Sequence, residues 1–397
     1  MSIVVRTISD DEFDSAVRAS VLGFGDHASD ELLRVARSDA DVGRTFGAFD
    51  GRDIVGTTVT RTSAMTIPGG TAKLGFVDDV AVLPTHRRRG ILTQMMRAQL
   101  DQMRESDEPL SALSASESLI YERFGFGIAT WYHRWKIDRR HTAMKVPPNG
   151  GGRVRFISAD TAREVWPKLH AKVRDTRVGM VHYSEKSWRA ALWDAEFQRD
   201  GATEFFHVAY IRGDRIVGLC TYRRRERTIL VFFLLGEDAE VEAELWRYCF
   251  GIDLTLEIQT WPRPTDDPLP WRLDDPRRLE RSLIDHMWLR LVDVKVARVS
   301  RSYAEAGGLT LRVHDEFCTW NDGVYLLEAG VDGAECTRSQ GEPQVELGVS
   351  DLGAAYLGGV SFSNLARAGR VKEHAPGALA SADRMFRTER QPWSMEL

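Results

Sequence analysis

One stretch of the chain, residues 77–93, passes directly from a strand pattern into a helix pattern across a cluster of positive charge. Val80 and Val82 belong to an apolar run typical of a buried strand, Pro84 ends it, and apolar residues recur at helical spacing from Ile91 onward. Three arginines and a glycine occupy the turn. Because a helix start offers unpaired N–H groups and the positive end of the helix dipole, the stretch predicts a cradle for a pyrophosphate group. A basic, solvated helix start is the alternative.

The same stretch resembles the acetyl-CoA-binding motif of the GCN5-related N-acetyltransferase (GNAT) superfamily. The family pattern, R/Q-x-x-G-x-G/A, is matched by the run from Arg87 to Gly90, while Leu92 stands where a small residue is usual. THRRRGIL, taken with ASESLIYERFGFGIAT at 115–130, narrows the resemblance to the enhanced intracellular survival (Eis) acetyltransferases of actinobacteria.

The composition and net charge of the chain argue against some other classes of function, namely binding to nucleic acid or to an anionic membrane. The 397 residues suffice for two or three domains, and 43% hydrophobic residues suffice for real cores. A net charge of −5 offers no basic field for nucleic acid or an anionic membrane, and it suits a cationic substrate. We therefore expect no nucleic acid and no membrane as partner, and the Eis resemblance implies a small-molecule amine as substrate.

The four cysteines, Cys220, Cys249, Cys318 and Cys336, lie far apart and form no CxxC or Cys/His spacing. They predict reduced thiols rather than a disulfide framework or a metal site. The first residues lack a basic segment followed by a long apolar run, and no run of 18 apolar residues occurs in the chain. We therefore expect a cytoplasmic protein that binds no metal.

The N-terminal part of the chain has the order of elements expected for a GNAT domain. A short strand at 3–5 precedes two helices, which begin near Ser9 and Asp30, and a hairpin over 46–61 follows. The central strand, the cradle and its helix come next. Trp131 to Ile137 is expected to close the sheet of this domain.

An internal repeat follows a linker at Pro147–Gly152. FGAFDGRDIVGTTVTR (46–61) aligns without gaps with VAYIRGDRIVGLCTYR (208–223), which indicates duplication of a whole domain. A chance similarity of two hairpins is the alternative. In the second copy, four carboxylates between Glu237 and Glu242 occupy the helix start and would repel a pyrophosphate. We therefore predict that the second domain binds no cofactor and forms one wall of the substrate site.

From about Met287, strand-like runs precede helical periods, a pattern typical of a separate α+β domain. The Eis resemblance implies a sterol-carrier-like fold here. The predicted fold is therefore α/β and α+β: tandem GNAT-like domains, each a mixed central sheet flanked by helices, followed by a sterol-carrier-protein-like domain. The predicted limits are 1–146 for the catalytic GNAT domain, 147–286 for the copy that lacks the cofactor motif, and 287–397 for the last domain.

The resemblance also implies how acetyl-CoA, the cosubstrate, would be bound. Six positions match the family's contacts: Arg87, Arg88 and Gly90 for the diphosphate, the backbone of Val80 and Val82 for the pantetheine arm, and Ser116 near the thiol. The arm would add to an irregular strand through main-chain hydrogen bonds. Backbone N–H groups near Asp79 would face the thioester oxygen.

Two further positions match the family's catalytic groups. Tyr121 aligns with the general acid, and Leu397 carries the terminal carboxylate that the family brings to its active site. A phenol of pKa about 10 is a weak acid toward a thiolate of pKa about 8.5, so a strong hydrogen bond is the expected role of Tyr121. A buried structural tyrosine and a frayed chain end are the alternatives.

For the substrate, Phe24 matches an aromatic wall, and Asp26 and Glu396 match anionic positions of the family's pocket. The family's tryptophan in the second helix has no counterpart in the run Glu31–Ala36. The first hypothesis is an acetyl-CoA-dependent N-acetyltransferase that modifies several amines of aminoglycosides or similar polycationic molecules by direct attack on the thioester. The alternatives are a lysine acetyltransferase acting on protein or peptide, and a non-catalytic small-molecule or lipid binding protein. The resemblance further implies a hexamer, a dimer of trimers.

Overall fold

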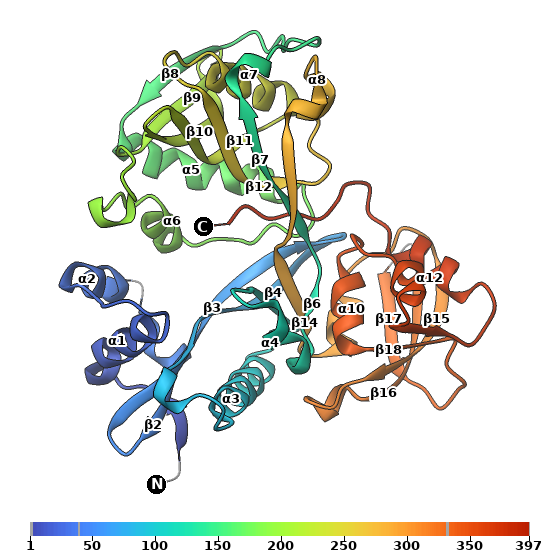
Figure 1. The fold of residues 1–397 in the computed structure, drawn as a ribbon. Coiled ribbons are helices and arrows are strands. Elements are labelled where there is room, and N and C mark those ends of the chain that lie inside the picture. The colour runs from blue at the N-terminus through green and yellow to red at the C-terminus, as the bar shows by residue number, and fades with distance from the viewer. Residues whose placement is uncertain (1–2, 39, 331–332, 397) are drawn as a thin grey trace. The chain divides into compact units, whose positions relative to one another are not determined.

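The computed structural model describes residues 3–38, 40–330 and 333–396. The chain forms two compact units, each built from two separate parts of the sequence (Figure 1). Unit 1 contains residues 1–130 and 286–389, and unit 2 contains residues 131–285 and 390–397. Within the described ranges, no helix combines the length and the apolarity needed to cross a bilayer.

The first part of unit 1 is a seven-stranded mixed sheet in the order β1-β2-β3-β4-β5-β14-β6. Its strands are β1 (Val4–Thr7), β2 (Thr45–Asp50), β3 (Asp53–Ile67), β4 (Gly70–Val82), β5 (Leu110–Ser114), β6 (Gly127–Ile128) and β14 (Met287–Leu291). Its helices are α1 (Phe13–Gly23), α2 (Asp30–Ser38), α3 (Ile91–Glu105) and the short α4 (Ser118–Tyr121). Only β4 and β5 are parallel among these neighbours.

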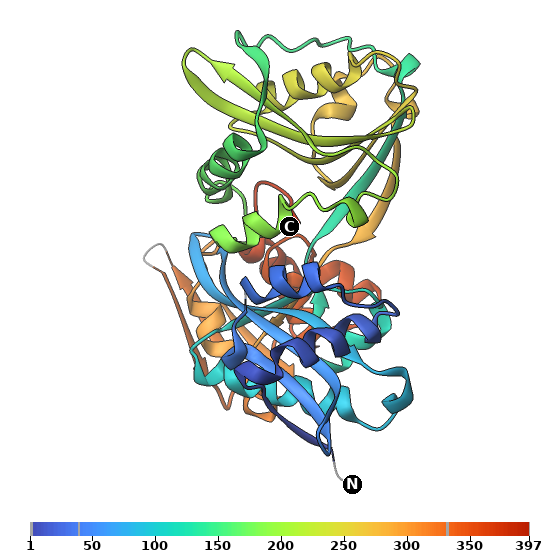
Figure 2. The same ribbon diagram turned by 90° about the vertical axis from the view of Figure 1, so that its left-hand side faces the viewer.

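Alternating residues of the β2–β3 hairpin explain where the helices lie. Phe49 and Ile54 share a core with α1, whereas Ala48 and Val55 share a core with Ile91 and the rest of α3. Successive side chains of a strand point to opposite faces of its sheet. The helices α1 and α3 therefore cover opposite faces, as both views show (Figures 1 and 2).

The second part of unit 1 is a five-stranded sheet in the order β17-β16-β15-β18-β19. Its strands are β15 (Gly307–His314), β16 (Gly323–Gly330), β17 (Gly333–Arg338), β18 (Val345–Gly348) and β19 (Val371–Glu373). Its helices are α9 (Val294–Val299), α10 (Val349–Tyr356), α11 (Phe362–Arg367) and α12 (Ala378–Phe386). The predicted α+β character of this region is confirmed.

A buried ion pair joins the two sheets of unit 1. Arg290 of β14 and Asp315, which follows β15, lie 2.6 Å apart between Nη2 and Oδ2, with side chains 0% and 1% exposed. Arg290 also donates to the Phe124 carbonyl oxygen, and Asp315 accepts from the Cys318 N–H and from Asn321 Nδ2. The pair is thus extended by further hydrogen bonds, which a buried charge pair needs to offset its desolvation.

Unit 2 is a second seven-stranded sheet in the order β13-β7-β12-β11-β10-β9-β8. Its strands are β7 (Trp131–Asp138), β8 (Arg153–Ile157), β9 (Phe206–Arg212), β10 (Arg215–Arg225), β11 (Thr228–Gly236), β12 (Glu257–Pro264) and β13 (Glu280–Asp285). Its helices are α5 (Ala159–Arg174), α6 (Glu185–Ala191), α7 (Ala239–Phe250) and α8 (Leu269–Arg272).

The strand β7 has nearly the predicted extent, but the prediction that it closes the first sheet was wrong. β7 pairs with β12 and β13 of unit 2. In the first sheet, β14 lies beside β5, from Met287 opposite Ser114 to Leu291 opposite Leu110. Sequence periodicity identifies a strand but not its partner, because pairing depends on distant parts of the chain. The domain limits stay predictions.

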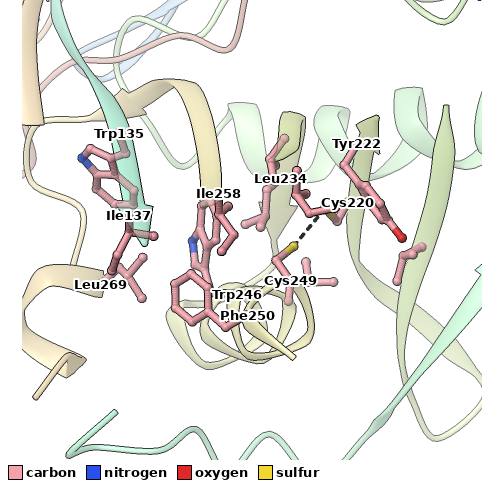
Figure 3. Packing of buried hydrophobic residues seen from close by; sticks show 14 of the residues in the cluster. Trp135, Ile137, Cys220, Tyr222, Leu234, Trp246, Cys249, Phe250, Ile258 and Leu269 are labelled. Carbon is pink, nitrogen blue, oxygen red and sulfur yellow. Dashed lines mark hydrogen bonds between the residues drawn. The ribbon is translucent and has the colours of Figure 1, made fainter. Parts of the chain in front are cut away.

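The strand β7 also contributes to the core of unit 2 (Figure 3). Trp135 of β7 lies against Trp246 of α7, with ring centroids 5.8 Å apart, and Cys220 and Cys249 meet nearby at 3.7 Å between their Sγ atoms (Figure 3). All four cysteines are free and buried. Because β7 supplies one of the largest buried side chains, its pairing in this sheet is held by core packing.

The two repeated hairpins share an irregularity. The register of β2–β3 shifts at Val55, and that of β9–β10 shifts at Val217. These valines align in the repeat, so the bulge recurs at the equivalent residue. The predicted duplication is thereby supported over a chance match of two hairpins.

At the start of α7, carboxylates are engaged within unit 2. Asp238 Oδ1 accepts from the Val241 N–H at 2.9 Å, and Glu242 lies 2.7 Å from Arg263 Nη2. The side chain of Asp238 thus occupies a donor that an anion would need. The absence of a cofactor from this copy remains a prediction.

Candidate active site

The central strand β4 carries a bulge at its two adjacent aspartates. Thr57 of β3 lies opposite Ala81, whereas Val59 lies opposite Asp78, so β4 has one extra residue here. Asp79 takes a left-handed backbone conformation with a φ of 51°, and Thr57 Oγ1 donates to its carbonyl oxygen at 3.1 Å. The bulge bends the strand and changes the direction of the side chains around it.

Beyond the bulge, one edge of β4 is free. In the described part of the chain, β4 pairs with β5 only from Leu74 to Phe76. The backbone of Val80 and Val82 therefore faces no strand on that side, and both side chains are half-buried. An extended ligand arm can add to such an edge through main-chain hydrogen bonds. The binding of a pantetheine arm by these two valines stays a prediction.

The turn after β4 presents basic groups at the start of α3. Gly90 caps the helix with a φ of 76°, and nothing lies within 4 Å of the place that a Cβ would take. Conformation, rather than space, therefore requires glycine. Arg88 is exposed, has a φ of 62°, and forms no hydrogen bond or ion pair with a described residue. Its guanidinium is available for an anion.

The other two arginines of the turn are held. Arg87 donates through Nε to the Val82 carbonyl oxygen at 3.3 Å and through Nη2 to that of Gly23 at 3.2 Å. Arg89 Nη1 lies 3.6 Å from Oδ2 of Asp50, the last residue of β2. Arg87 is therefore held against the end of β4, Arg89 is directed toward Asp50, and the diphosphate contact of Arg87 stays a prediction.

The bulge concentrates negative charge beside one cation. Arg61 Nε donates to Asp78 Oδ2 at 2.8 Å, and Arg61 Nη2 lies 3.6 Å from Asp79 Oδ2. Burial, followed by the charge of Asp78, raises the pKa of Asp79 to about 6, against the opposing attraction of Arg61. Because 46% of the Asp79 side chain is exposed, solvent screens part of this effect.

Replacing Asp79 with asparagine should stabilise the protein at neutral pH and not in acid. The native pKa lies above the ordinary value near 3.9, so ionisation of Asp79 lowers native stability as the pH rises from about 4 to 6. Asparagine removes this loss and tolerates the left-handed conformation. After solvent screening, we expect a gain of about 1 kcal/mol at pH 7.5 that vanishes below about pH 4. Thermal unfolding of both proteins across this range checks it; a pH-independent difference would contradict the role of the charge.

Tyr121 ends α4, a few residues after the loop that contains the exposed Ser116. Its side chain is 5% exposed and meets the edge of the Phe126 ring. In the part of the chain that the structure describes, its hydroxyl has no hydrogen-bond partner. Burial, followed by the charges of Asp78 and Glu117, raises the pKa of Tyr121 to about 12. The phenol is thus a neutral, unengaged donor influenced by the bulge carboxylate.

The predicted substrate residues Phe24 and Asp26 follow the end of α1. A Cβ on Gly23 would lie 2.8 Å from the Ala81 Cβ, so this helix end packs directly on β4. Phe24 is 60% exposed, and Asp26 is exposed with its Oδ1 accepting from the His27 N–H. The structure therefore brings this loop to the strand that carries the bulge.

The remaining predicted residues, Glu396 and Leu397, belong to the C-terminal segment of unit 2. This segment is anchored there: the Tyr183 hydroxyl donates to the Met395 carbonyl oxygen at 2.7 Å. Glu396 is exposed, and Leu397 lies outside the described residues. Their approach to Tyr121 stays a prediction.

Sequence reasoning missed the side chains of Arg61, Asp78 and Asp79, because it used only the backbone of this part of β4. Two signals could have found them. Adjacent aspartates are unusual in an apolar strand. Arg61 also recurs in the internal repeat as Arg223, which pairs with Asp194 at 2.8 Å.

A bulged central strand that parts from its neighbour, followed by a glycine-capped helix start with exposed arginines, defines the GNAT class of acetyltransferases. Two acetyltransferase (GNAT) domain families match residues 4–129 and 179–298, and the sterol carrier protein domain family matches residues 294–395. The predicted succession of two GNAT-like domains and a sterol-carrier-protein-like domain is therefore confirmed.

Relatives of full length identify the family. An uncharacterized N-acetyltransferase of Streptomyces coelicolor is 36% identical over 99% of both chains, and N-acetyltransferase Eis of Mycobacterium tuberculosis is 30% identical over 98% of both. The crystal structure of Eis1 from Mycobacterium abscessus has a TM-score of 0.86 at 31% identity and full coverage. The chain belongs to the Eis family of GNAT enzymes and is an N-acetyltransferase.

Proposed function

We propose that this enzyme transfers acetyl groups from acetyl-CoA to several amines of one polycationic small molecule, such as an aminoglycoside. The observation that carries the proposal is the bulge of β4, where Asp78 and Asp79 lie beside a free strand edge and the arginine turn. Carboxylates attract a cationic acceptor, whereas the arginines and the helix start suit the phosphates of the donor. One unit thus offers opposite charges to the two substrates.

Acetyl-CoA is the acetyl donor of GNAT enzymes, and the residues present fit it. Arg88 is free, Arg87 lies beside the edge of β4, and the backbone of Val80 and Val82 is open to an added strand. Gly90 leaves the helix start uncovered, and Ser116 lies in the exposed loop before Tyr121. In this proposal, these groups bind and orient the donor so that the amine attacks its thioester directly.

The acceptor amine must lose a proton before it attacks, because an amine of pKa about 10.4 is neutral only about once in several thousand at pH 7. Asp79, whose pKa is about 6, is mostly ionised at pH 7 and is a better proton acceptor than an ordinary aspartate. The terminal carboxylate of Leu397 is the acceptor that the family resemblance implies. Asp26 and Glu396 would add to the negative field.

The leaving thiolate needs a donor, and Tyr121 is proposed for this role. Its pKa of about 12 exceeds that of a thiol, about 8.5, so complete proton transfer would cost about 5 kcal/mol. A hydrogen bond from the phenol to the developing thiolate avoids that cost and still stabilises the transition state.

The test is release of CoA thiol from acetyl-CoA against a panel of aminoglycosides, linear polyamines and lysine peptides, with the acetyl groups on each product counted by mass. Several acetyl groups on one aminoglycoside support the proposal. Release with peptides alone would move the function to protein acetylation. No release with any amine would overturn the proposed substrate class.

A further inference from the structure

The sterol-carrier-like region of unit 1 contains an arginine whose guanidinium has no partner among the residues that the structure describes. Arg298, on α9, is 0% exposed, and its Nε, Nη1 and Nη2 atoms are each buried without a hydrogen-bond partner. In the described ranges, it is the one arginine whose three nitrogens are all in this state. No carboxylate of a described residue lies within ion-pair distance of it.

The surroundings of Arg298 add positive charge rather than removing it. Arg301 is also buried, at 2% exposure, and donates to the carbonyl oxygens of Ser302, Tyr356 and Phe386 rather than to a carboxylate. Burial, the largest cause, lowers the pKa of Arg301, and the nearby charge of Arg298 acts in the same direction. Two buried guanidinium groups therefore share one region.

Two further groups near Arg298, Tyr303 and Cys336, are neutral. The Tyr303 hydroxyl donates to the Arg298 carbonyl oxygen at 2.9 Å. Burial raises the pKa of Tyr303 and that of Cys336 on β17, and in both cases the first opposing influence is the charge of Arg298. A phenol and a thiol with raised pKa values stay protonated at neutral pH, so neither balances the guanidinium.

A buried unpaired charge carries a large free-energy penalty, and arginine cannot escape it by losing its proton. Asp293 caps α9, and its Oδ1 accepts a hydrogen bond from the Val296 N–H at 2.9 Å. The carbonyl end of a six-residue helix offers only a weak partial charge. Among the described residues, no group therefore supplies a counter-ion for the charge of Arg298.

We propose that Arg298 binds a monocarboxylate inside the sterol-carrier-like region. A carboxylate carries the single negative charge that is missing and accepts two parallel hydrogen bonds from one guanidinium. The neutral phenol of Tyr303 and the neutral thiol of Cys336 near Arg298 suit a ligand whose charge is confined to one end. The same chemistry is offered by a small free carboxylate and by the headgroup of a longer amphiphile.

The test measures thermal unfolding of the whole protein in sodium acetate or sodium decanoate against sodium chloride at equal ionic strength. A saturable rise of about 2–4 °C with a carboxylate, absent in Arg298→Leu, is expected. Saturation with acetate assigns a free carboxylate, and saturation with decanoate alone assigns an amphiphile. The proposal is overturned if neither salt gives a saturable rise, or if the rise persists in Arg298→Leu.

Two controls separate binding from a change in the fold. Arg367→Leu removes an exposed positive charge from α11 of the same region and should keep the carboxylate effect. Arg298→Leu should keep acetyl transfer, because Arg298 is no part of the proposed active site, and it should unfold no lower than wild type without carboxylate, since leucine suits a buried position. If Arg298→Leu and Arg367→Leu lost the carboxylate effect equally, the assignment of the site to Arg298 would be contradicted.

Discussion

Replacing Asp315 with alanine is expected to lower the free energy of unfolding by about 3–5 kcal/mol. The substitution leaves Arg290, 0% exposed, without the carboxylate that lies 2.6 Å from its Nη2 atom. It also removes the acceptor of the Cys318 N–H and one of the three acceptors of Asn321 Nδ2. Since Arg290 stands on β14 and Asp315 follows β15, the loss falls on the connection between the two sheets of unit 1.

Urea unfolding followed by circular dichroism measures this effect. The matched control is Glu305→Ala, which removes an exposed partner of Arg384 in the same unit. Exposed ion pairs contribute at most about 1 kcal/mol, so this control should unfold almost as the wild type does. Equal effects of the two substitutions would contradict a structural role for the buried pair.

Replacing Tyr121 with phenylalanine is expected to lower kcat about 10–100-fold and to leave acetyl-CoA binding nearly unchanged. The variant keeps the ring that packs against Phe126. It removes only a hydroxyl that touches no described hydrogen-bond partner, so the fold should persist. Because the pKa of Tyr121 is about 12, wild-type turnover should show no loss from ionisation of this phenol below about pH 10.

Steady-state thiol release gives kcat, and acetyl-CoA titration followed by calorimetry gives the affinity. Tyr325→Phe is the control, because that buried hydroxyl donates to the Asn321 carbonyl oxygen at 2.8 Å in the sterol-carrier-like region. It should reduce stability and not turnover. Unchanged kcat in Tyr121→Phe would remove the proposed donor role.

Local patterns in the sequence predicted the elements that carry their own periodicity. The helix after the arginine turn buries Ile91, Met95, Met96, Leu100 and Met103 along one face, as its apolar spacing indicates. The glycine of the turn is required by its left-handed conformation. The repeated hairpins even share a bulge at equivalent valines. These features depend on residues close together in the chain, so the sequence alone predicts them.

Strand partners could not be predicted in the same way. The strand at 131–138 was identified, yet its pairing with β12 and β13 rests on residues more than 100 positions away. A strand's periodicity shows which of its faces is buried and not which neighbour it joins. The large side chain of Trp135 in the core of unit 2 favours the observed partner.

The sequence by itself determined the class of this protein, because a strand, an arginine turn and a helix that starts at a glycine follow one another within residues 77–93. The repeat in the second domain lacks the basic residues of this turn. Only the tertiary structure decided where charge is unbalanced. Asp78 and Asp79 share Arg61, Arg290 is paired with Asp315, and the guanidinium of Arg298 has no partner among the described residues. The physical reason is that the energy of a charge depends on its distance to other charges and to water, and folding sets those distances between residues far apart in the chain.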